Sequence, residues 1–280
     1  MTAPAPELPP RAAEPENEVK LSFIDHLRDL RKRLARALLG VAVGMALVGG
    51  FVERIFHWLM EPVLASLPES QRALHYTSYV EPLMVYLKVA LYGGIFAAIP
   101  WVLWQLWLFV APGLYKREKR VVVPFLVFGT LLFYAGAAFC YYVIMPAAFP
   151  AMAAIASDTS LAPVLTMSAQ LSLVLAMLLG FGVVFEVPVV IAFLSMVGLV
   201  NARTLAKYRR YAVLVNLVAA ALITPTGDPL NLAFMAVPMI VFYEIGIVLA
   251  RILGKPAAPE GEPPPPRAGR GGDEPAGVRG

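Results

Sequence analysis

Three carboxylates in this sequence are set among apolar or basic residues, in surroundings that could make them binding groups. Glu186 is the only charged residue between Asp158 and Arg203, a stretch long enough to cross a bilayer. A charged group at the centre of a membrane helix costs about 2.5–3.5 kcal/mol on insertion scales, so it is normally kept to face a partner, a cavity or a pathway. Pro188 removes a helical hydrogen bond two residues later. The pattern favours a membrane protein with a functional, non-uniform interior.

The other two carboxylates, Asp29 and Glu118, are each surrounded by basic residues, including Arg31 and Lys116. Arginine binds a carboxylate through two parallel hydrogen bonds that lysine cannot reproduce. Two spaced carboxylates could therefore recognise two arginines, while the neighbouring bases reject lysine-rich ligands. Two simpler interpretations stay open. Asp29 could form an ordinary (i, i+4) pair with Arg33, and Glu118 could be incidental within a basic stop-transfer cluster.

Composition defines the class of molecule that must position these groups. The 280 residues are 59% hydrophobic and 15% charged, with a mean hydropathy of +0.70, whereas soluble domains carry about 25% charged residues. A single cysteine, Cys140, excludes an intramolecular disulfide and a cysteine metal site. The three histidines show no metal-ligand spacing, and no phosphate-binding loop or nucleophile–base set is present. We therefore predict no catalytic residue, no metal and no cofactor.

Uncharged runs predict an all-α integral membrane protein with six transmembrane helices, each judged against the roughly 20 residues needed to span a bilayer. The runs are about 34–51, 83–110, 121–145, 168–199, 211–227 and 229–250. The fifth has only seventeen residues, about 26 Å of helix. It must either be matched by a thinner bilayer or continue into polar residues.

Charge asymmetry predicts the orientation of these spans. Twenty of the 23 Lys and Arg residues fall in the two terminal segments and the 111–120 and 199–210 loops, which six spans place on one side. Positive charge marks the cytoplasmic side, so both termini are expected there. Residues 1–19 and 255–280 are predicted to be disordered tails flanking a membrane domain at 20–254. Ser22 is predicted to cap an amphipathic helix that lies at the membrane surface and runs into the first span.

Four segments resemble the TatC family, the multispanning subunit of the twin-arginine protein translocase. Residues 23–34 look like its F-x-x-H-L-x-E-L-R-x-R-L signature, and residues 109–118 look like its F-x-x-P-x-L-Y-x-x-E segment. Residues 185–188 match F-E-x-P, and residues 224–229 resemble its T-P-x-D-P turn with one residue inserted. The matches occur in order over about residues 20–254.

The resemblance implies a concave, glove-like bundle in the cytoplasmic membrane of a prokaryote. It implies a receptor that binds twin-arginine signal peptides of folded cargo at the cytoplasmic face and uses the proton-motive force. The expected partners are single-span TatA/TatB-type subunits and other TatC copies, with no nucleic acid. By alignment, Glu118 matches the loop glutamate that contacts the arginines, and Phe109 begins the same motif. Asp29 occupies the place of a second glutamate, with one methylene less, and Glu186 that of an intramembrane glutamate on the concave side.

The resemblance also places partner docking at the turn between the fifth and sixth spans, through Thr224, Asp228 and Asn231. The family often has a glutamine where this chain has Leu232, beside Asn231. Two other classes stay open on the residues alone. A small-solute transporter would also keep Glu186, as a proton relay. An intramembrane enzyme would need a catalytic partner for Glu186, which the sequence does not show.

Overall fold

The structure is a computed structural model that describes residues 15–69, 72–110, 122–157, 164–223 and 229–254. The regular secondary structure of these residues is helical, apart from one isolated bridge between His75 and Thr166, and turns and irregular segments connect the helices. Five stretches are long and apolar enough to cross a membrane: 26–65, 81–109, 123–154, 167–197 and 229–253. The helices are α1 (Pro15–Val48), α2 (Val52–Ala65), α3 (Glu81–Val110), α4 (Val122–Phe139), α5 (Met145–Ser157), α6 (Met167–Val197), α7 (Ala202–Lys207), α8 (Arg209–Ile223) and α9 (Pro229–Leu253).

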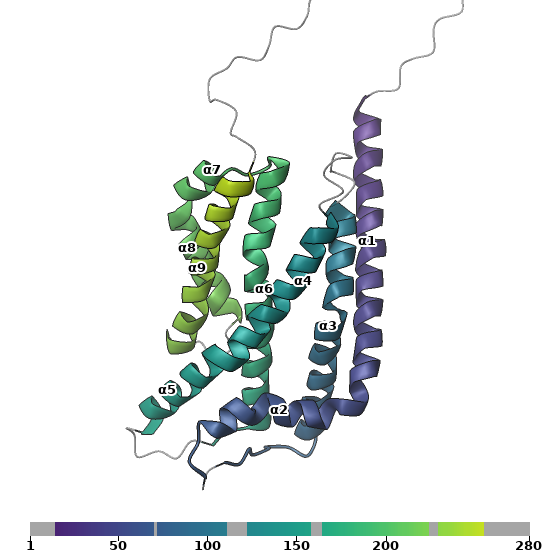
Figure 1. The fold of residues 1–280 in the computed structure, drawn as a ribbon. Helices are drawn as coiled ribbons and strands as arrows, with labels where there is room; N and C mark the ends of the chain where they lie inside the picture. Colours follow the sequence, from purple (N-terminus) through teal and green to yellow (C-terminus); the bar gives the residue numbers. More distant parts are fainter. Residues whose placement is uncertain (1–14, 70–71, 111–121, 158–163, 224–228, 255–280) are drawn as a thin grey trace, which may run out of the picture.

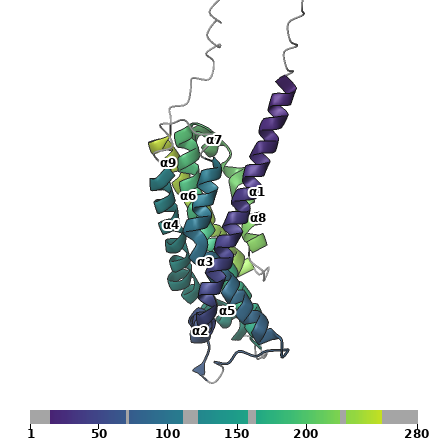
Figure 2. The ribbon, with the colours of Figure 1, turned by 90° about the vertical axis from the view of Figure 1, so that its right-hand side faces the viewer.

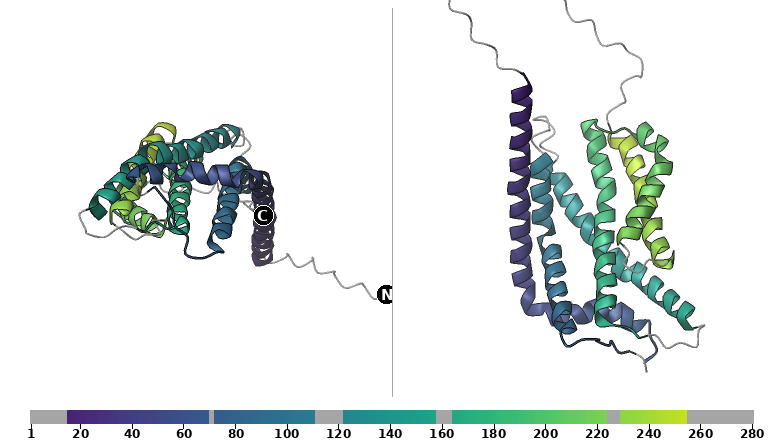
Figure 3. Two further views of the ribbon diagram at one scale, coloured as in Figure 1. Left: turned by 90° about the horizontal axis from the view of Figure 1, so that it is seen from below. Right: turned by 180° about the vertical axis from the view of Figure 1, so that it is seen from behind.

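The helices form an open array with α1 at one edge and α8 with α9 at the other (Figure 1). Helix α1 packs along α3, α4 crosses α6, and α9 packs against both α6 and α8. The beginning of α1 and the end of α9 lie at the same end of the molecule (Figure 1). Helix α2 runs across the opposite end, beneath the long helices (Figure 3). The array thus has two distinct ends joined by long apolar helices.

Helix α1 is continuous from Pro15 to Val48, so it begins before both the predicted cap at Ser22 and the predicted domain boundary at residue 20. Its N-terminal part extends straight beyond the other helices (Figures 1 and 2). The prediction that this part lies along the membrane surface is therefore wrong, since a segment collinear with a spanning helix cannot lie in the membrane plane. Further along α1, where the helix packs against α3, a Cβ on Gly44 would come within 2.6 Å of the Gly94 carbonyl oxygen. Glycine here allows α1 and α3 to approach closely.

Helix α2 lies in a segment that the sequence predicted to be a loop. Its apolar residues recur at helical spacing, and Phe56, Leu59, Met60 and Val63 are buried against the main core. Charged residues such as Glu53 and Arg54 occupy its exposed face. At fourteen residues, about 21 Å, it is too short to span a bilayer and instead covers one end of the bundle.

The third predicted span ends at Met145, but in the structure α4 continues into α5 through a π-helical turn, Cys140–Ile144. Pro146, predicted to lie in a connection, instead falls within the first turn of α5. Proline cannot donate a backbone hydrogen bond and its ring collides with the carbonyl four residues earlier. The wider π turn supplies the room for it, so the helix proceeds to Ser157.

Two other prolines leave helical carbonyls without a donor, and tyrosines from α4 and the π turn satisfy both. Pro100 cannot bond to the Phe96 carbonyl, which accepts a 2.8 Å hydrogen bond from the Tyr134 hydroxyl. In the same way Pro62 frees the Trp58 carbonyl, which accepts a 2.7 Å bond from the Tyr141 hydroxyl. The Tyr134 bond therefore links α4 to α3, and the Tyr141 bond links the π turn to α2.

At the end where α9 finishes, α6 stops at Gly198, whose φ of 87° is a left-handed conformation that glycine adopts without strain. The connection that follows contains α7, whose first turn is capped by the Asn201 side chain accepting the Thr204 N–H at 2.7 Å. Helix α8 has fifteen residues, about 22 Å. The α8–α9 hairpin stops short of the level of α2 (Figure 1). Helix α8 is the short span that the sequence predicted, whereas α9 has 25 residues.

Aromatic residues near the ends of α3, α4 and α6 form a second, smaller core. Trp107 is buried and its ring lies 4.5 Å from Phe193 and 5.8 Å from Phe125, between ring centroids. Trp101, by contrast, is exposed and donates a 2.9 Å hydrogen bond to the Arg36 carbonyl of α1. Trp107 therefore faces the interior, whereas Trp101 lies at the surface beside α1.

Candidate functional site

Asp29 lies on the extended part of α1 and is paired within its own helix. Its Oδ2 accepts a 2.7 Å hydrogen bond from Arg33 Nε, one turn later. The Asp29 side chain is 36% exposed and that of Arg33 is 17% exposed. The simpler of the two sequence interpretations, an (i, i+4) pair, is what the structure contains. Any incoming arginine must share this carboxylate with Arg33 or displace it. Arg31 is exposed on the same helix.

A ring contact brings two of the predicted motifs together. The imidazole of His26 on α1 stacks on the Phe109 ring at the end of α3, with 4.5 Å between centroids and 27° between planes. Asp29 follows His26 by less than one helical turn. The motif of residues 23–34 and the beginning of the motif of residues 109–118 thus lie side by side at the end of the molecule where α1 begins. The Trp101–Arg36 bond fastens the same two helices.

Four predicted site residues lie outside the residues that the structure describes. Glu118 and Lys116 belong to the segment that joins α3 to α4, and Thr224 and Asp228 belong to the segment that joins α8 to α9. Asn231, in the first turn of α9, is described and is buried, with 2% of its surface exposed. Its side chain is therefore buried rather than presented at the surface.

Glu186 lies on α6 where that helix crosses α4. Its Oε1 is buried without a hydrogen-bond partner among the described residues. A Cβ placed on Gly129 of α4 would come within 2.9 Å of Oε2 and 3.2 Å of Oε1. The carboxylate therefore sits directly over the backbone of α4, in space that exists because residue 129 has no side chain. An unsatisfied buried carboxylate oxygen in an apolar helix is costly, which marks the position as a polar site.

Lys88 lies within the second predicted span, 83–110, and the structure shows two hydrogen-bond partners for it. Its ammonium donates to the hydroxyls of Ser168 at 3.1 Å and Ser172 at 2.9 Å, both on α6. Glu81, at the start of α3, accepts the Ser168 N–H at 3.0 Å. The signal that could have revealed this contact is the (i, i+4) spacing of the two serines, which puts both hydroxyls on one face.

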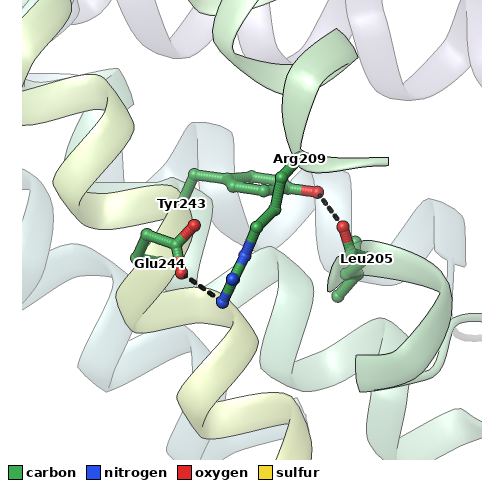
Figure 4. A network of polar contacts seen from close by, with 4 residues as sticks. All are labelled: Leu205, Arg209, Tyr243 and Glu244. Atoms are coloured by element: carbon green, nitrogen blue, oxygen red, sulfur yellow. Dashed lines mark hydrogen bonds and ion pairs between the residues drawn. The ribbon is translucent and has the colours of Figure 1, made fainter. Parts of the chain in front are cut away.

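A second network missed from the sequence joins α7, α8 and α9 (Figure 4). Arg209 Nη2 lies 2.8 Å from Glu244 Oε2, and the Tyr243 hydroxyl donates a 3.0 Å hydrogen bond to the Leu205 carbonyl. Glu244, which interrupts the apolar run of the last span, therefore has a cationic partner on the neighbouring helix. Both charged side chains remain nearly half exposed. An exposed ion pair contributes little to the free energy of folding, so the main effect of this pair is to orient α8 relative to α9.

The described part of the chain holds no group of three or more His, Cys, Asp or Glu residues that could bind a metal ion. Its polar side chains instead form contacts between helices, around Lys88 on α3 and α6 and around Arg209 on α7, α8 and α9.

Comparison with known proteins assigns this helical membrane protein to a family. Residues 25–238 match the family model of the Sec-independent protein translocase protein TatC. A TatC protein of Koribacter versatilis is 38% identical over 252 residues, covering 88% of this chain and 92% of its own length. One from Desulforapulum autotrophicum is 40% identical over 238 residues, covering 85% and 87%. The chain belongs to the TatC family, whose members are named as components of a protein translocase, a transport role rather than catalysis.

Solved structures agree with this assignment. A crystal structure of the twin-arginine translocase receptor TatC superposes with a TM-score of 0.74 at 34% identity, covering 81% of this chain and 99% of that one. A second crystal structure of that receptor, in the detergent DDM, gives a TM-score of 0.73 at 33% identity, covering 80% and 99%. The chain is thus a multi-pass membrane protein of the Tat translocase, and its fold is that of the receptor.

Proposed function

We propose that this protein is the receptor subunit of a twin-arginine translocase in the cytoplasmic membrane of a prokaryote. It binds twin-arginine signal peptides of folded cargo at the end of the molecule where α1 begins. In this proposal six helices cross the membrane, α8 being the sixth beside the five long apolar stretches, and both termini are cytoplasmic. No enzymatic step is part of this role.

The observation that supports the proposal is the His26–Phe109 contact, which brings His26, three residues before Asp29, against the end of α3. The segment bearing Lys116 and Glu118 starts from this same helix end. An incoming pair of arginines would meet Asp29 on α1 and Glu118 on the adjoining segment. Arg31 and Lys116 would repel ligands that carry positive charge without the guanidinium geometry. A single arginine would engage only half of this arrangement.

The remaining predicted residues fit a role in assembly and transport. Glu186 would offer a polar contact within the membrane to a TatA/TatB-type subunit. The α8–α9 hairpin, through Thr224 and Asp228, would dock a further single-span subunit or another copy of this chain. The buried Asn231 would support the start of α9 rather than touch the partner. Energy would come from the proton-motive force, with folded cargo crossing through the assembled complex.

The test measures capture of a twin-arginine signal peptide by the full-length protein in nanodiscs, compared with the same peptide carrying two lysines. We expect the arginine peptide to bind more tightly. Removing one carboxylate, as in Glu118→Ala, should weaken its binding by about ten- to a hundredfold, because a hydrogen bond to a charged group contributes about 1.5–3 kcal/mol. Glu53→Ala is the matched control, since Glu53 is an exposed carboxylate at the opposite end.

Equal capture of the two peptides by the unmodified protein would contradict the receptor proposal. Unchanged capture in Glu118→Ala, with preference for arginine retained, would remove Glu118 from the recognition site. A loss of binding in Glu53→Ala as large as that in Glu118→Ala would show that the effect comes from net charge alone.

A further inference from the structure

A cavity of about 390 Å³ lies near the end of the molecule covered by α2. Its walls come from the end of α1 and from α2, α3, α4, the π turn and α6. Among the lining residues are Trp58 of α2, Phe96 of α3 and Leu175 of α6. The volume falls within the roughly 300–1,000 Å³ range of small-molecule sites. The site described above uses none of the residues that line it.

The lining is mostly apolar side chains, and two of its hydroxyls are engaged elsewhere. The Tyr134 hydroxyl donates to the Phe96 carbonyl and the Tyr141 hydroxyl to the Trp58 carbonyl. Both bonds satisfy carbonyls that prolines leave free, so these hydroxyls and carbonyls are held in protein contacts. A water in such a space would find few of the two to four polar partners that it needs. The cavity therefore fits hydrocarbon better than water or a polar solute.

The cavity opens toward the surroundings of the helices. Four of its lining residues are exposed: Tyr142 at 68%, Trp58 at 45%, Tyr134 at 38%, and Ala138. Tyr134 and Tyr142 belong to the third apolar stretch, 123–154, so the opening lies at the depth of the spans. Tryptophan and tyrosine are the side chains favoured where membrane hydrocarbon meets the polar headgroups. The molecules that surround an opening at this depth are lipids.

We propose that this cavity is a binding site for one acyl chain of a membrane phospholipid. The chain enters past Trp58 and Tyr142 and lies against α3 and α6, filling the space between α2 and the π turn. An empty apolar space of this size would forfeit the van der Waals contacts of its lining. A seated acyl chain supplies those contacts and holds α2 against the bundle.

The test uses the intrinsic fluorescence of Trp58 in the full-length protein, reconstituted in phosphatidylcholine vesicles whose acyl chains carry bromine. Bromine quenches tryptophan on contact. Trp101 is the matched reference, because it is 46% exposed, against 45% for Trp58, and does not line the cavity. The separate signals of Trp58 and Trp101 are obtained by difference from Trp58→Phe and Trp101→Phe. We expect at least twofold stronger quenching of Trp58 than of Trp101.

A cavity-filling variant makes the assignment specific. Ala138 lines the cavity, whereas Ala135, on the same helix and also exposed, does not. Ala138→Phe should reduce the quenching of Trp58 to the level of Trp101, and Ala135→Phe should leave it unchanged. The proposal is overturned if the signals of Trp58 and Trp101 are quenched alike, a comparison that needs no cavity-filling substitution. It is also overturned if quenching of Trp58 falls as protein density rises, which would indicate a second copy of the chain in the cavity.

Discussion

At the scale of single residues, the two tyrosine–carbonyl bonds show how this membrane protein tolerates proline inside its helices. A carbonyl without a donor in a low-dielectric interior costs roughly 1–3 kcal/mol. Tyr134 and Tyr141 supply the missing donors from neighbouring helices. Each bond therefore has two effects, since it satisfies a backbone group and fixes the spacing between two helices.

We predict that Tyr134→Phe lowers the free energy of unfolding by about 1–3 kcal/mol, because the Phe96 carbonyl loses the hydroxyl that replaces the missing backbone donor. Pro100→Ala restores a backbone N–H at the position that normally donates to Phe96. The Tyr134→Phe penalty should therefore shrink in the Pro100→Ala background. A double-mutant cycle from denaturant unfolding in detergent measures the coupling. Tyr142→Phe, at a 68% exposed tyrosine, is the control, and additive penalties would refute the argument.

The Asp29–Arg33 pair gives a second prediction at this scale. Arg33 occupies the carboxylate that the proposed receptor site offers to a signal peptide. Arg33→Gln removes this competitor while keeping a long polar side chain. We expect tighter binding of a twin-arginine peptide, by up to about fivefold, because a surface pair of this kind contributes roughly 0–1 kcal/mol. Titration of nanodisc-held protein with labelled peptide measures it. Weaker binding in Arg33→Gln would argue that Arg33 positions Asp29 rather than competes for it.

At the scale of helices, uncharged runs were enough to place α1, α3, α4, α6 and α9, because a membrane span needs about 20 apolar residues in succession. Helix α2 was missed because Glu53, Arg54 and Glu61 interrupt its apolar residues and resemble a loop. Pro146 was read as a helix end, since the π turn that accommodates it has no sequence signal of its own.

The candidate site was accessible from the sequence only in part. Motif spacing located Asp29, Phe109 and Glu186. Motif spacing did not predict that His26 contacts Phe109, more than 80 residues away. It also did not predict that the Glu186 carboxylate lies against Gly129. Such contacts depend on how helices cross, which the periodicity of one helix does not encode.

The link between α3 and α6 provides the prediction at this scale. Removing both serine partners, in Ser168→Ala with Ser172→Ala, leaves the half-buried Lys88 ammonium without its hydrogen bonds. Breaking a buried charged contact costs about 3–5 kcal/mol, and partial exposure should reduce this. We expect the double variant to be less stable than Lys88→Met alone. Adding Lys88→Met to the double variant should restore part of the stability, as measured by thermal unfolding. A further loss on that addition would show that Lys88 has other partners that matter more.

At the scale of the whole molecule, charge and helix length together define how the protein sits in its membrane. The basic residues of α1, α7 and the start of α8 gather at the end that also holds the end of α9. The opposite end carries α2 and the bridge that joins His75 to Thr166. Helix α8 is about 22 Å long, shorter than a hydrocarbon core of about 30 Å. Crossing by α8 would therefore require local thinning of the bilayer beside the α8–α9 hairpin.

Labelling single cysteines tests this arrangement, because Cys140 is buried and is the only native cysteine. In a Cys140→Ala background, cysteines replace Thr204 on α7, Tyr79 at the opposite end, where the side chain is 95% exposed, and Pro229 at the start of α9. We expect a membrane-impermeant maleimide added outside intact spheroplasts to label positions 79 and 229 but not 204, and to reach 204 only after lysis. Protection of 229 with labelling of 79 would mean that α8 does not cross, leaving five spans. That result would put the two ends of the chain on opposite sides, against the positive-inside distribution of its 23 Lys and Arg residues, so the accessibility of position 229 decides between six crossings and five.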